Sequence, residues 1–81
     1  MSSPDIVPIS DDEIRLGQFL KLAGLAESGA EARELVAEGE VSVNGEVDTR
    51  RGRRLVVGDV VRVDLPQGAA HAQVGSAGTA D

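Results

Sequence analysis

Apolar residues recur with a helical period in the segment "LGQFLKLAGL". They stand at positions i, i+3, i+4 and i+7, a spacing that gathers them on one face of a helix: Leu16, Phe19, Leu20 and Ala23. Gly24 follows and is a common helix-ending residue. "SDDE" at residues 10–13 has the spacing of a capping box and would start the helix earlier, but Gly17 and the broken periodicity favour a start near Arg15. The pattern predicts a helix over residues 16–23.

A second helical pattern follows in "SGAEARELVAEGE". Ser28 can cap the N–H of Glu31, and Glu31 can reach back to Ser28, which makes a second capping box. Gly39 marks the end, so we expect a helix over about residues 29–38. Arg33 lies about 100° away from the apolar stripe and should face solvent. The stripe itself consists of Ala32, Leu35 and Val36.

After Gly39 the apolar period changes to two, which is typical of strands. Asn44-Gly45 marks a hairpin turn, but a strict two-residue turn would pair Ser42 with Val47 and mix polar with apolar positions. We therefore expect a loop one residue longer, which pairs Val43 with Val47. A last strand, "VVRVDL" at residues 60–65, follows the turn "VGD" and ends at Pro66.

The two ends of the chain carry weaker signals. "DIVPI" could form a strand, and Pro8 would confine it to a sheet edge. Residues 66–81 contain a single Val among Ala, Gly, Gln and Ser, so we expect them to be mostly disordered. The prediction is an α+β fold, with two short helices packed on a small antiparallel sheet over residues 14–65, an arm at 1–13 and a tail at 66–81.

Composition excludes several classes of function. The chain has 81 residues, enough for one small domain, and no cysteine, so neither disulfides nor a thiolate zinc site are expected. No apolar run approaches the ~20 residues of a membrane span, and the N-terminus lacks the pattern of a signal peptide, so we expect a cytoplasmic protein.

Catalytic chemistry has few candidate residues. His71 is the one imidazole and falls in the predicted tail, and no phosphate-binding glycine motif follows a strand. The carboxylates of the second helix are better explained by capping and solvation. We expect no enzyme activity, no catalytic residue, no metal site and no cofactor.

The charge distribution is uneven. The net charge is −6, yet four of the eight basic residues lie within residues 50–54. Residues 1–49 carry three basic and eleven acidic residues, whereas residues 50–63 carry five basic and one acidic residue. A partner within a Debye length of about 8–10 Å responds to such a local field more than to the net charge.

The arginine cluster allows two interpretations. It could be a solvated loop that protects a sheet edge from aggregation. Four like charges this close, with no anion nearby, instead favour an anionic partner, and Arg grips phosphate with a planar fork. Phe19, the one aromatic residue, is on the buried stripe, so recognition by base stacking is not expected. The start of the second helix, at Ser28 and Gly29, offers a further anion site, and these features together suit the backbone of folded RNA.

The run from Ile14 to Val63 also resembles a known family, the RNA-binding domain named after ribosomal small-subunit protein four (the S-four domain, or alpha-L motif). The similarity rests on "RL..FL" at Arg15, "S..EAR.L" at Ser28, "G.V.VNG" at Gly39 and "GDVV.V" at Gly58. The sequence is most similar to the small bacterial stand-alone members. Two positions depart from the family pattern, since Gly17 replaces an acidic residue and Gly29 a basic one.

The resemblance implies two helices packed on a small sheet, with structured RNA, ribosomal or tRNA-like, across the helices and the hairpin. The residues that match the family surface are Arg15, Lys21, Ser28, Arg33 and Asn44, with Arg50, Arg51, Arg53 and Arg54 alongside. We therefore expect a monomeric, ribosome-associated RNA-binding protein. The alternative is a protein-interaction adaptor that contacts ribosomal or other basic proteins through the acidic residues Glu31, Glu34 and Glu38.

Overall fold

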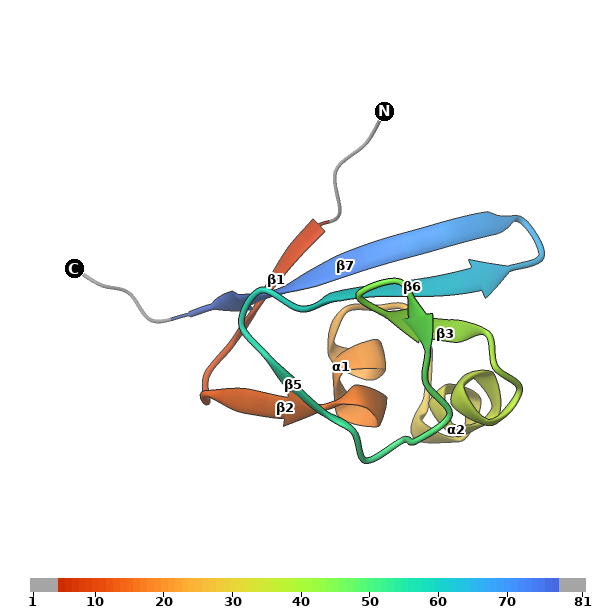
Figure 1. The fold of residues 1–81 in the computed structure, drawn as a ribbon, viewed down its shortest axis with the longest axis horizontal. Helices are drawn as coiled ribbons and strands as arrows, with labels where there is room; N and C mark the ends of the chain where they lie inside the picture. Colours follow the sequence, from red (N-terminus) through yellow and green to blue (C-terminus); the bar gives the residue numbers. More distant parts are fainter. Residues whose placement is uncertain (1–4, 78–81) are drawn as a thin grey trace.

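The computed structural model describes residues 5–77, which form two helices, a five-stranded sheet and a two-stranded sheet. Both helices lie on one side of the larger sheet, which has the order β1-β7-β6-β3-β4 (Figure 1). The elements are β1 (Asp5–Ile9), β2 (Glu13–Arg15), α1 (Leu16–Leu22), α2 (Gly29–Ala37), β3 (Val41–Val43), β4 (Glu46–Val47), β5 (Arg54–Val56), β6 (Val60–Leu65) and β7 (Gly68–Ser76). The α+β class is confirmed, but the sheet is mixed because β1 runs parallel to β7.

Both helices lie close to their predicted positions. α1 begins directly after Arg15 and ends before Gly24, whose φ of 75° is in the left-handed region. Residues 13–15 form β2, so the capping box at residues 10–13 does not start the helix. Ser28 Oγ accepts the Glu31 N–H at 3.1 Å, as expected. The return contact differs, because Glu31 Oε1 accepts the N–H of Glu27 at 2.6 Å instead of that of Ser28.

The expected longer hairpin loop was wrong. β3 and β4 pair Val43 with Glu46 and Ser42 with Val47 around a two-residue turn. Asn44 and Gly45 have φ angles of 52° and 88°, and two consecutive positive φ angles fit the type I′ turn, whose twist matches that of the strands. Turn geometry therefore overrides the apolar pattern, and Val47 is left 61% exposed.

The disorder predicted for residues 66–81 was wrong for residues 68–76, which form β7. This strand lies between β6 and β1 and has hydrogen-bonded neighbours on both sides. Small side chains fit the crowded position: Ala72 is buried, and a Cβ built on Gly75 would collide with Ile6 Cγ2. Backbone pairing on both edges thus stabilises a segment with little apolar surface. Residues 78–81 lie outside the described part of the chain.

The remaining strand predictions have mixed outcomes. β6 occupies residues 60–65 as predicted, and β1 lies at a sheet edge, as Pro8 requires. The pairing of β2 with β5 was not predicted. Each of these strands has only three residues, too few for an alternating pattern to be recognised. They connect the start of α1 to the segment that contains the arginines.

One apolar cluster joins the helices to the sheet. Its fully buried side chains come from α1, α2 and the inward positions of β3, β5, β6 and β7. The largest are Phe19, Leu16, Leu20, Leu55, Val36, Val41, Val43, Val61, Val63 and Val74. Over residues 5–77, no helix has the length and apolar character that a membrane span requires.

A substitution in β7 tests the inclusion of the C-terminal segment in the core. Val74→Ala should lower the free energy of unfolding by about 2 kcal/mol, because it removes two buried methyl groups and leaves a cavity. Val57→Ala, at a side chain that is 50% exposed, is the control and should change it by less than about 0.5 kcal/mol. Urea denaturation measures both values, and equal effects of the two substitutions would contradict the position of β7.

Candidate nucleic-acid interface

The arginine-rich segment, residues 48–55, is fixed to the first turn of α1. The Leu16 N–H donates to the Arg53 carbonyl at 2.8 Å, and the Gly17 N–H donates to the Arg51 carbonyl at 3.0 Å. N–H groups in the first turn of a helix have no hydrogen-bond acceptor within the helix. Arg15 makes no side-chain cap, so the segment itself caps the helix. In Figure 1 the connection between β4 and β5 accordingly passes beside α1 and α2.

Asp48 holds this segment in its bent conformation. Its carboxylate is buried and accepts the Arg50 backbone N–H at 2.9 Å, Arg50 Nε at 3.0 Å and Arg50 Nη2 at 2.9 Å. Arg53 Nη1 donates to the same group at 3.0 Å. The hydrogen bonds from the Arg50 side chain are the main reason that the pKa of Asp48 lies far below its usual range, against the opposing effect of burial. The carboxylate therefore stays ionised.

The expectation that the arginine cluster has no anion nearby was wrong. Arg50 and Arg53 bind Asp48, and Arg54 Nε lies 3.5 Å from Glu13 Oε2 across the β2–β5 pair. Arg62, on β6, pairs with Asp64 at 3.1 Å. These side chains have intramolecular partners that offset part of their charge. Like-charge crowding therefore gives less support to an anionic partner than the sequence indicated.

The other four basic residues of the chain have no acidic partner within residues 5–77. They are Arg15, Lys21, Arg33 and Arg51, and all four are exposed. Arg51 lies beside two of the others, Arg15 and Arg33, in two separate hollows. Arg51 and Arg15 line one hollow with Gly17, Gln18 and Gly52, and Arg51 and Arg33 line a second, open one with Val36, Ala37, Thr49 and Gly52. We call Arg15, Arg33 and Arg51 the three-arginine surface.

Arg51 is the centre of this surface because it lines both hollows. Arg15 comes from the end of β2, directly before α1, Arg33 from α2 and Arg51 from the connection between β4 and β5. Lys21 lies four residues after Gly17 on α1, and residues at that spacing share a helix face. It therefore continues the face that Arg51 covers toward the other end of α1.

The other predicted site residues have structural partners. Asn44 Nδ2 donates to Asp59 Oδ1 at 3.0 Å, and its Oδ1 accepts the Val60 N–H at 2.9 Å, so the side chain joins the hairpin to β6. At the start of α2, Ser28 Oγ accepts the Glu31 N–H and the Glu31 carboxylate accepts the Glu27 N–H. Phosphate binding at Ser28, Gly29 and Asn44 stays a prediction.

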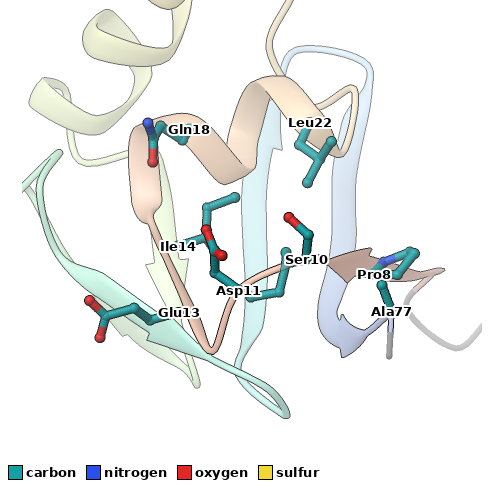
Figure 2. A pocket seen from close by; sticks show the side chains of 9 residues that line it. Pro8, Ser10, Asp11, Glu13, Ile14, Gln18, Leu22 and Ala77 are labelled. Atoms are coloured by element: carbon teal, nitrogen blue, oxygen red, sulfur yellow. The ribbon is translucent and has the colours of Figure 1, made fainter. Parts of the chain in front are cut away.

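A further hollow lies beside α1, between β1 and β2 (Figure 2). Its apolar walls include Ile9, Ile14 and Leu22, and Asp11 and Glu13 are the charged residues that line it. Carboxylates repel phosphate, so this hollow does not suit an RNA backbone. The surface around α1 thus has an acidic part, at residues 11–13, and a basic part, at Arg15 and Arg51.

Two functional residues of this region were missed at the level of the sequence. Asp48 carried a local signal, since an Asp two residues before a backbone N–H commonly accepts from it, as it does here with Arg50. Gly17 was used to place the helix start and was noted as a departure from the family pattern, but its contact with Arg51 was not predicted. Its contact with Arg51 joins residues far apart in the sequence, so no local pattern could have revealed it.

The Asp48 contacts can be tested by substitution. Asp48→Asn should lower the free energy of unfolding at pH 7 by about 2 kcal/mol, because charge-assisted hydrogen bonds to both arginines are lost. Asp64→Asn, in the exposed pair with Arg62, is the matched control and should cost less than about 1 kcal/mol.

The effect should also depend on pH. Since folding lowers the pKa of Asp48, its contribution is complete above the unfolded pKa of about 3.9 and is lost as the pH falls toward the folded pKa. The difference between the parent and Asp48→Asn should therefore be smaller at pH 3 than at pH 7, as measured by urea denaturation. An equal difference at both values would mean that the ionised carboxylate is not the stabilising group.

Comparison with known proteins identifies the family of this fold. The family described as S4 domain matches residues 7–69. The "Probable ribosome maturation protein RlbA" of Bacillus subtilis is 50% identical over 64 residues, which cover 79% of this chain and 87% of that protein. The "Putative RNA-binding protein YbcJ" of Escherichia coli is 46% identical over 48 residues, which cover 59% and 69% of the two chains.

A solved structure extends the similarity over nearly the whole fold. The solution structure of YbcJ from E. coli, described as revealing an alpha-L motif involved in RNA-binding, superposes with a TM-score of 0.66 at 35% identity. The superposition covers 94% of this chain and 92% of YbcJ. With its two helices packed on one side of a sheet and its match over residues 7–69, the chain belongs to the S4 domain family.

Proposed function

We propose that the chain is a non-catalytic RNA-binding module that grips the backbone phosphates of folded RNA through the three-arginine surface. The observation that carries the proposal is the convergence of Arg15, Arg33 and Arg51 from three separate parts of the chain, without an acidic partner among residues 5–77. Half of the basic residues form ion pairs within the chain, and in the other half Arg51 lines one hollow with Arg15 and another with Arg33. An external polyanion is the partner that this arrangement fits.

The type of contact follows from the available side chains. Guanidinium groups donate paired hydrogen bonds to phosphate oxygens, and each neutralised phosphate releases counterions. Phe19, the one aromatic residue of the chain, is fully buried, so no aromatic ring is available for stacking on an unpaired base. Recognition would therefore depend on the spacing of phosphates in a helical or otherwise folded RNA.

The relatives support an RNA partner and a role near the ribosome. One is named a probable ribosome maturation protein and another a putative RNA-binding protein. From these names and the surface chemistry, we infer that the target is structured RNA, ribosomal or tRNA-like, bound by a cytoplasmic monomer. Over residues 5–77 there is no group of three or more His, Cys, Asp or Glu residues suited to a metal ion, and the proposed function needs none.

A second candidate function, a protein adaptor, is favoured by the hollow of Figure 2. Asp11 and Glu13 line it together with Leu22, whose side chain is 52% exposed. A protein segment with lysine or arginine beside an apolar side chain would fit this chemistry, and ribosomal proteins are a class of such partners. This function does not require the three-arginine surface, so the two candidates can be separated by substitution.

The RNA-binding proposal can be tested with labelled ribosomal-RNA hairpins, from which the tightest binder is kept. Combined Arg15→Gln, Arg33→Gln and Arg51→Gln should weaken its binding more than about tenfold at roughly 0.1 M salt. The plot of log affinity against log salt concentration should lose a slope of about 0.7–0.9 for each phosphate contact removed. Stability should change little, because these side chains are exposed.

Arg62→Gln supplies the matched control. It also removes an exposed arginine, but from the sheet face opposite the helices, since its neighbours Val61 and Val63 point into the core. Its salt slope should equal that of the parent. Binding by the triple variant with an unchanged slope, or no binding of any hairpin by the parent, would contradict the proposal and leave the adaptor function as the better explanation.

A further inference from the structure

Gly17 lies where the side chain of Arg51 crosses α1. A Cβ built on Gly17 would be 2.7 Å from Arg51 Cγ and 3.3 Å from Arg51 Cδ. The aliphatic stem of Arg51 therefore occupies the space that any other residue at position 17 would fill. The Gly17 N–H also donates to the Arg51 carbonyl at 3.0 Å, so backbone and side chain of Arg51 both lie against this one residue.

Backbone conformation does not explain the glycine. Gly17 is absent from the positive-φ residues of the chain and belongs to the first turn of α1, where an alanine would be more favourable for the helix. The close approach of Arg51 is the feature that requires a residue without a side chain. Position 17 thus holds a weak helix former at the point where the stem of Arg51 lies on the helix.

The contact places the Arg51 side chain against α1 at the centre of the three-arginine surface. Its stem lies on α1, and it lines both the hollow with Arg15 and the hollow with Arg33. A free arginine loses considerable rotamer entropy when it binds a phosphate, and a side chain that is already restricted loses less. Arg50 and Arg53 are held by the Asp48 carboxylate, whereas the stem of Arg51 is held by its contact with α1. The charge of Arg51 therefore stays available to a ligand.

We propose that Gly17 is a positioning residue for RNA binding. Because Gly17 has no side chain, the stem of Arg51 can pack against α1, and this packing places the guanidinium between Arg15 and Arg33. This inference rests on the proposed RNA-binding function and adds to it a specific role for a residue that cannot itself contact a phosphate through a side chain. Any larger residue at position 17 would displace the stem of Arg51.

A double-mutant cycle tests the inference with the RNA hairpin used above. Gly17→Ala should keep or raise the midpoint of thermal unfolding, because alanine favours the helix and the exposed Arg51 side chain can rotate away. It should nevertheless weaken RNA binding by about three- to tenfold, which corresponds to the cost of ordering one long side chain. In an Arg51→Ala background the same substitution should have no effect on affinity.

The outcomes distinguish this inference from the proposed function. Weaker binding by Arg51→Ala with unchanged binding by Gly17→Ala would overturn the inference alone. An equal loss from Gly17→Ala in both backgrounds would overturn it as well, because the effect would not pass through Arg51. If Arg51→Ala binds as tightly as the parent, with the same salt slope, then the proposed three-arginine site itself is wrong.

A measurement on the unsubstituted protein covers the case in which Gly17→Ala unfolds. Nitrogen-15 relaxation of the arginine Nε groups reports their order on the picosecond to nanosecond timescale. Arg51 Nε should be more ordered than Arg33 Nε in the free protein, since the stem of Arg51 packs on Gly17 whereas Arg33 is exposed on α2. Equal mobility of the two groups would contradict the positioning role of Gly17.

Discussion

The attachment of residues 48–55 to the first turn of α1 is the interaction on which the rest of the structure depends. Two N–H groups of the helix donate to carbonyls of this segment, and Asp48 binds two of its arginines. The β2–β5 pair continues the attachment with Ile14 opposite Leu55, which is fully buried. A mostly exposed connection rich in like charge is thereby fixed against the core, and Arg51 is held beside both helices.

This attachment also explains how an acidic chain can present a basic surface. Only some of the arginines form ion pairs with carboxylates. Asp48, Glu13 and Asp64 are the carboxylates in these pairs, and Asp48 is buried. Among residues 5–77, Arg15, Arg33 and Arg51 have no such partner. Because screening limits charge effects to about 8–10 Å, the local field at this surface differs from the field implied by the net charge of −6.

The sequence predicts those elements whose signals are local. Capping and periodicity place α1 and α2 to within a residue or two, and alternation places β6. The hairpin was wrong because the apolar alternation through Val47 was given more weight than the preference of Asn44-Gly45 for a tight turn. β7 was missed because its stability comes from hydrogen bonds to β6 and β1, which composition does not reveal.

The candidate site divides in the same way. Arg15, Lys21 and Arg33 were predicted as site residues from the family resemblance, Lys21 and Arg33 also from their exposed helical positions, and all three lack acidic partners within residues 5–77. The four clustered arginines appeared equivalent in the sequence, whereas three of them have carboxylate partners and Arg51 has none within residues 5–77. That difference depends on Asp48 and Glu13, and Glu13 is far from the cluster in sequence, so only the folded chain shows it.

The most direct test of the account follows the arginine Nε–Hε signals by NMR while a ribosomal-RNA hairpin is added. Phosphate contacts change the environment of a guanidinium group, so the account predicts shifts or broadening for Arg15, Arg33 and Arg51. Arg62, on the opposite face of the sheet and paired with Asp64, should keep its signal unchanged. Unchanged signals for the three-arginine surface in the presence of bound RNA, or changes centred on Arg62, would contradict it.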